Sequence, residues 1–153
     1  MAENEAPDYF EPAGGAVLTH LLIVRDVDRS RDYYHRVLGA EVVRDREPAI
    51  LRFHNGYLVL NTEGGPTDDK PDVRAVAPPD ARTLSSAINI RVTDVRAVYE
   101  TWRDRGAEFL TEPKDHGVEI RCYLRDPDGY LIEVGQGTGI LAEMGRRPQP
   151  RTS

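Results

Sequence analysis

Several common features of proteins are scarce or absent in this 153-residue chain. No apolar run of about 18 residues occurs, so the sequence predicts no membrane-spanning helix. The 26 acidic and 20 basic residues are interleaved and give a net charge of -6, which argues against a nucleic-acid surface, because such surfaces need clustered basic side chains. A single cysteine, Cys122, excludes an internal disulfide framework. The acidic start of the chain has no apolar segment behind basic residues, so we expect no secretory signal and a cytoplasmic protein.

Residues 123–134 form the most informative stretch, which has the pattern of a strand, a tight turn and a second strand. The turn is Asp126-Pro127-Asp128-Gly129, in which Pro fixes φ and Gly tolerates positive φ. The strand that follows is apolar except for Glu133. A buried carboxylate needs a partner, because an unpaired buried charge is very costly. We expect that partner to be a metal, an arginine or a ligand.

The same order of elements occurs twice along the chain. Asp28 is a candidate N-cap for a helix that runs to Leu38, and Asp94 caps a second helix that ends at Gly106. His54-Asn55-Gly56 is predicted to be a hairpin turn of type I′, which Asn-Gly favours. Short apolar or alternating runs predict strands at residues 16–25, 41–44, 49–53, 57–61, 86–92, 109–110, 118–124 and 130–134.

An internal repeat accounts for this duplication. Residues 25–27 and 38–41 are echoed by residues 93–95 and 105–108, and residues 55–60 are echoed by residues 128–133. Each half is predicted to be a βαβββ module. We place module 1 at 16–62, a linker or loop at 63–85 and module 2 at 86–136, with a flexible lead-in at 1–15 and a tail at 137–153. The composition of residues 63–79 excludes a helix, and we leave open whether the segment is a plain linker or a loop over a site.

The duplicated βαβββ pattern resembles the vicinal oxygen chelate superfamily, which includes glyoxalase I, extradiol dioxygenases and bleomycin-binding proteins. The motifs that carry the resemblance are Thr19-His20 in the first strand, Tyr33-Tyr34 followed by Leu38-Gly39, and the run from Asp126 to Glu133. The resemblance implies an α+β fold in which two tandem modules form a curved mixed sheet around a cleft. It also implies a homodimer.

The resemblance further implies a divalent metal (Fe, Mn, Ni or Zn) held by up to four side chains from the first and last strands of each module. His20 and Glu133 match two of these positions, whereas Leu60 and Ala87 stand at the other two. Catalytic zinc sites use three protein ligands, so a further ligand is required. The candidates for this ligand are His116, His54, Asn89 and Glu119.

Alternation along the strands of module 2 predicts which residues face the cleft. Apolar residues occupy one face, and the opposite face carries Asn89, Arg91, Glu119, Arg121, Tyr123 and Glu133. The arginines suit an anionic or carbonyl-rich ligand, because a guanidinium donates two parallel hydrogen bonds. The alternatives are a solvated sheet face or an ion pair of Arg121 with Glu133 or Glu119. For His20 the alternative is a core histidine bonded to backbone.

Two functions fit these observations. The first is a metal-dependent enzyme (a lyase, isomerase or dioxygenase) acting on a small oxygen-rich substrate. His20 and Glu133 would hold its metal, Glu133 or Glu119 would be the catalytic base, and Asn89, Arg91, Arg121 and Tyr123 would bind substrate. The second is a metal-independent protein that binds or sequesters a small molecule such as an antibiotic. An aromatic content of only 7% and a charged cleft wall favour the enzyme.

Overall fold

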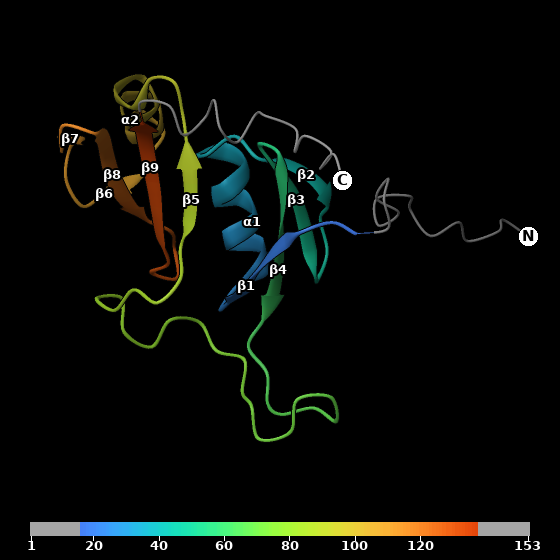
Figure 1. The fold of residues 1–153 in the computed structure, drawn as a ribbon. Helices are drawn as coiled ribbons and strands as arrows, with labels where there is room; N and C mark the ends of the chain where they lie inside the picture. The colour runs from blue at the N-terminus through green and yellow to red at the C-terminus, as the bar shows by residue number, and fades with distance from the viewer. Residues whose placement is uncertain (1–15, 138–153) are drawn as a thin grey trace, which may run out of the picture.

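The computed structural model describes residues 16–137, which form two sheets with one helix each (Figure 1). The first module contains β1 (Thr19–Val24), α1 (Val27–Arg36), β2 (Glu41–Arg44), β3 (Ala49–Phe53) and β4 (Gly56–Thr62). The second contains β5 (Ile88–Arg91), α2 (Val95–Asp104), β6 (Glu108–Phe109), β7 (Lys114–Asp115), β8 (Glu119–Arg125) and β9 (Leu131–Gly137). The predicted α+β class is confirmed. The predicted lead-in and the predicted tail beyond residue 137 lie outside the described residues.

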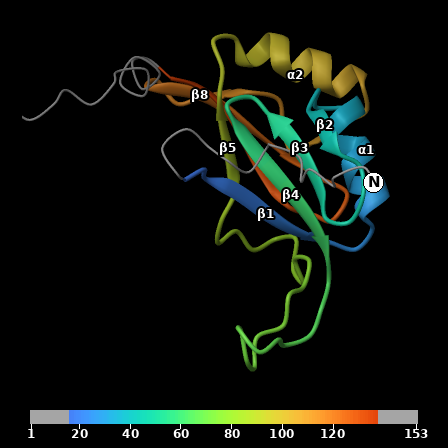
Figure 2. The ribbon, with the colours of Figure 1, turned by 90° about the vertical axis from the view of Figure 1, so that its right-hand side faces the viewer.

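The strands follow the same order in both sheets. The first sheet has the order β1-β4-β3-β2 and the second has β5-β9-β8-β6, with the short β7 added beside β8. In each sheet the first strand pairs in parallel with the last strand of its module. Figure 2 shows both helices on one side of the molecule. Neither α1 nor α2 is long and apolar enough to span a membrane, and these are the helices of the described region.

Aspartate caps begin both helices. The Asp94 carboxylate accepts a hydrogen bond from the Ala97 N–H at 3.0 Å, which confirms the predicted cap. In the first module the cap is Asp26, which accepts from the Arg29 N–H at 2.9 Å. The predicted cap at Asp28 is therefore wrong, because the helix begins two residues earlier than that cap implies, at Val27.

The two hairpins that enter the last strand of each module differ in length. Because Phe53 pairs with Gly56, the first turn consists only of His54 and Asn55, and His54 takes the left-handed conformation with φ 54°. The predicted hairpin turn at residues 54–56 is confirmed, but its type I′ assignment is wrong, because type I′ needs positive φ at both turn residues and Asn55 lacks it. The turn in the second module covers residues 126–130 and places Gly129 at φ 91°, as its sequence predicts.

Because of this difference, the last strands of the two modules correspond with a shift of one residue relative to the sequence repeat. In the first module the buried Leu22 of β1 pairs with the buried Leu60 of β4. The corresponding buried pair in the second module is Ile90 of β5 with Val134 of β9. Strand alternation then makes Val59 the counterpart of Glu133. The sequence repeat had instead aligned Glu133 with Leu60, which lies in the core.

The turn at residues 126–130 joins the second module to the first. The Asp128 carboxylate accepts hydrogen bonds from the Arg25 N–H at 3.0 Å and from the Ser30 hydroxyl at 3.0 Å. The Tyr34 hydroxyl donates to Asp126 at 2.9 Å. Both aspartates are buried, with exposed fractions of 4–5%, and their hydrogen bonds connect the two modules.

The segment between β4 and β5 lies below both sheets and accepts hydrogen bonds from each module (Figure 1). Arg25 Nη2 donates to the Pro78 carbonyl at 3.0 Å, and Arg125 donates to the Ala81 carbonyl. Ala77 is 1% exposed, and its N–H donates to the Glu63 carboxylate at 2.9 Å. These contacts give the segment a defined path across the lower end of the molecule.

Candidate functional site

Three neighbouring strands of the second sheet place the predicted polar residues on one face. Asn89, Glu133 and Tyr123 lie side by side in one row across β5, β9 and β8. Arg91 and Arg121 flank Gly135 in the next row. The residues between them, such as Ile132 and Val134, are fully buried on the opposite face. The alternation predicted from the sequence is confirmed.

Glu133 is the centre of a hydrogen-bond network. Its Oε1 accepts from Asn89 Nδ2 at 2.8 Å and from Arg91 Nη2 at 3.0 Å. Its Oε2 accepts from the Tyr123 hydroxyl at 2.5 Å. This hydrogen bond raises the pKa of Tyr123. Of the three partners expected for Glu133, the structure shows an arginine.

Arg91 bridges two carboxylates. Its Nη1 donates to Glu119 Oε2 at 2.6 Å, while Nη2 binds Glu133, and the Arg91 side chain is only 13% exposed. Arg121 Nη1 donates to the other Glu119 oxygen at 2.5 Å, which is one of the ion pairs expected as an alternative. Hydrogen bonds from Arg91 and then Arg121 lower the pKa of Glu119. Glu119 is thus held as an anion by Arg91 and Arg121, and Glu133 is paired with Arg91.

Gly135 makes room for this bridge, and sequence reasoning missed its role. A Cβ atom at Gly135 would lie 2.1 Å from Arg91 Nη1 and 3.0 Å from Arg91 Cζ. The Arg91 guanidinium therefore lies directly over the glycine backbone. The available signal was a glycine two residues beyond Glu133, on the same face of the strand.

Arg121 is the charged member of the network most open to solvent. Its side chain is 36% exposed, against 13–19% for Arg91, Glu119 and Glu133. Among the described residues only its Nη1 has a protein partner. The remaining guanidinium nitrogens can donate to a bound carboxylate or carbonyl group.

A cavity of about 680 Å³ runs along β5 and separates it from the first module. Asn89 and Arg91 reach the cavity from the network. The lining is completed by residues 18–20, 53–58, 87, 88 and 90. A volume in this range suits a small-molecule ligand.

His20 also lines this cavity, but it belongs to the helix-covered face of the first sheet. His20 lies two residues before Leu22 and four before Val24 on β1, so its side chain points to the same face as these buried residues. By the strand pairing, the residue equivalent to Ala87 is Thr19 rather than His20. Burial lowers the pKa of His20, which favours the neutral imidazole.

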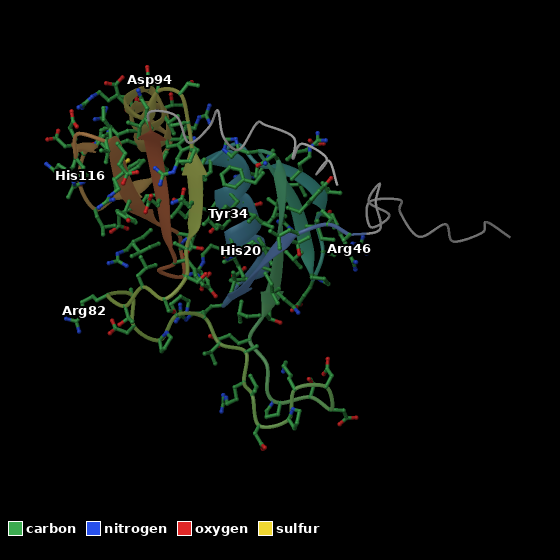
Figure 3. The ribbon with its side chains drawn as sticks, viewed as in Figure 1. His20, Tyr34, Arg46, Arg82, Asp94 and His116 are labelled. Atoms are coloured by element: carbon green, nitrogen blue, oxygen red, sulfur yellow. The ribbon has the colours of Figure 1, made fainter. Side chains whose placement is uncertain are left out.

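The donor set does not fit a divalent metal. Both oxygens of Glu133 already accept hydrogen bonds, and their donors are Asn89, Arg91 and Tyr123 rather than His20. Figure 3 shows His116 at the far edge of the second module, away from His20. Among residues 16–137, no three His, Cys, Asp or Glu side chains gather as a metal site. The guanidinium of Arg91 lies between the two carboxylates that would attract a cation.

Comparisons with known proteins agree with the fold. The profile of the Glyoxalase/Bleomycin resistance protein/Dioxygenase superfamily matches residues 16–134. The lactoylglutathione lyase of Haemophilus influenzae is 30% identical over 84% of this chain and 98% of its own length. The lactoylglutathione lyase of Pseudomonas aeruginosa is 28% identical over 85% and 87%. A glyoxalase/bleomycin resistance protein/dioxygenase from Nocardioides superposes with a TM-score of 0.64 at 20% identity, covering 90% of this chain and 89% of that one.

Proposed function

Because the chain belongs to the Glyoxalase/Bleomycin resistance protein/Dioxygenase superfamily, we propose that it is a glyoxalase-like enzyme of the lyase or isomerase type. Its substrate is a small, oxygen-rich molecule bound over the polar network of the second sheet, beside the cavity along β5. The names of the relatives support lyase chemistry. The observation that carries the proposal is the network in which Arg91 holds Glu119 and Glu133 beside that cavity.

Glu133 is the proposed general base. Its Oε1 has two donors, whereas its Oε2 has only the Tyr123 hydroxyl, so Oε2 is the oxygen more easily released to take a proton. The proton comes from a carbon next to a substrate carbonyl, and the electron pair remains on the substrate as an enolate. Return of the proton to a neighbouring carbon gives isomerisation, and loss of a leaving group gives a lyase reaction.

Arg121 is the proposed anchor for the substrate oxygens. Its free guanidinium nitrogens can donate two parallel hydrogen bonds and stabilise the enolate charge. In this proposal Arg91 and Arg121 supply the positive charge. The competing proposal is a metal held by His20 and Glu133, as the resemblance implies.

Turnover and metal content test the two proposals. We would assay small 2-oxo and 2-hydroxy acids and lactoylglutathione, with elemental analysis of the same protein. Glu133→Gln should lower kcat about 100-fold or more, and Arg121→Met should raise KM. Glu100→Gln, at an exposed position on α2, serves as the control. A stoichiometric metal lost in both His20→Ala and Glu133→Gln would instead establish the metal site.

A binding or sequestration protein is the second candidate. All four oxygens of Glu119 and Glu133 are paired within the protein without any ligand, and the cavity along β5 also carries apolar groups such as Phe53, Tyr57 and Ile88. Tight binding of a small molecule with no turnover would support it. We also propose a cytoplasmic homodimer, which light scattering coupled to size exclusion and cell fractionation would check.

A further inference from the structure

A second cavity lies where the segment between β4 and β5 crosses the lower end of the second sheet. Its volume is about 390 Å³, within the range of about 300–1,000 Å³ typical of ligand pockets. The apolar part of its lining consists of Val76, Pro78, Pro79, Leu84, Tyr130 and Leu131. Leu84 and Val76 are 48% and 44% exposed, so apolar surface is open to water at the mouth.

The walls of this cavity are held in place by contacts on both sides. Arg125 reaches from β8 to the Ala81 carbonyl. Asp80 accepts hydrogen bonds from the Arg82 N–H at 2.9 Å and from the Thr83 hydroxyl at 3.0 Å. The close approach also requires Gly129, where a Cβ atom would lie 3.1 Å from the Ala81 Cβ. These contacts fix the position of the cavity walls.

Leu131, which lines this cavity, lies on the same strand as Glu133 of the polar network. Leu131 and Glu133 are two residues apart on β9, so their side chains share one face of the sheet. On β8 the partner of Leu131 is Arg125 and the partner of Glu133 is Tyr123, so the two rows are adjacent. Leu131 and Gly135, which lies beside Arg121, are four residues apart, a span of about 13 Å. A ligand of that length can contact Arg121 and the cavity together.

We infer that the ligand of this site is amphipathic. Its carboxylate or paired oxygens bind at Arg121, and its aliphatic or aromatic group occupies the cavity formed by Leu84 and Leu131. This inference rests on the proposed function, because it uses the same polar network as the site for the oxygen-rich end. The apolar end gains affinity because it removes hydrocarbon surface from water.

A homologous series of unbranched 2-oxo acids, from pyruvate to 2-oxododecanoate, tests the inference by calorimetry. Once the chain reaches the cavity, each further methylene should tighten binding about fourfold, which corresponds to about 0.8 kcal/mol per buried methylene. Leu84→Ser should flatten this increase and leave the short acids unchanged. Leu110→Ser is the matched control, because Leu110 is 46% exposed and lies outside the cavity.

The outcomes separate the two proposals. If the short acids bind and affinity does not rise with chain length, the amphipathic ligand is wrong and the proposed function stands. If the rise persists in Leu84→Ser, the apolar end lies elsewhere and the inference is also wrong. If no acid of the series binds, the amphipathic ligand is wrong, and the turnover assay with 2-hydroxy acids and lactoylglutathione decides the proposed function separately. Thermal unfolding of each variant shows that folding is retained, as expected for two half-exposed leucines.

Discussion

Replacing Gly135 by alanine tests whether Arg91 organises the polar face of the second sheet. The new Cβ would lie 2.1 Å from Arg91 Nη1 and 3.0 Å from Arg91 Cζ, so the guanidinium must leave its position. Its hydrogen bonds to Glu119 and Glu133, at 2.6 and 3.0 Å, are then lost. The two carboxylates would remain largely buried without their shared cation, because their side chains are only 19% and 14% exposed.

The expected cost follows from that loss. Breaking a buried ion pair by removing one partner costs about 3–5 kcal/mol. Water reaches part of both carboxylates, so we expect the free energy of unfolding of Gly135→Ala to fall by about 2–4 kcal/mol. For a chain of this size the melting temperature should fall by about 5–12 °C. Urea unfolding followed by the fluorescence of Trp102, which is buried in α2, measures the change.

Two variants isolate the cause. Gly65→Ala is the control, because a Cβ there has no neighbour within 4 Å; it should be neutral or stabilise by about 0.4–1 kcal/mol through the unfolded chain. In an Arg91→Ala background, Gly135→Ala should cost less than about 1 kcal/mol, since nothing remains to be displaced. Wild-type stability of Gly135→Ala alone would refute the reasoning.

Two further predictions concern charge. Arg91→Met should leave Glu119 and Glu133 without their shared cation and create affinity for Mn²⁺ that the wild type lacks; titration calorimetry checks this, and equal binding by both proteins would contradict it. Burial, and then the charge of Asp128, raise the pKa of Asp126 from 3.8 to about 6. The folded state therefore holds this proton more tightly than the unfolded chain, and stability of up to about 3 kcal/mol is present below pH 4 and lost as pH rises through 6. Asp126→Asn should remove that component from a series of urea titrations across this range, whereas an unchanged profile would assign the pH dependence to other groups.

Local sequence chemistry determined much of this protein. The repeat predicted the two modules, and the glycines that follow the two helices, Gly39 and Gly106, have positive φ, which glycine adopts without strain. Alternation placed Asn89, Arg91 and Glu133 on one face, because side chains point to opposite sides along any strand. These features depend on residues close together in the chain, which is why a single sequence predicts them.

Only the tertiary structure decided how the candidate site is connected. A two-residue turn at His54-Asn55 and a longer turn before β9 shift the last strands of the two modules by one residue, so that Val59 rather than the buried Leu60 corresponds to Glu133. Strand register depends on turn length and on backbone pairing, and neither is visible in matched motifs. Arg91 spans three strands above Gly135 to reach Glu119, and that choice of partner depends on distances that form only when the sheet is assembled.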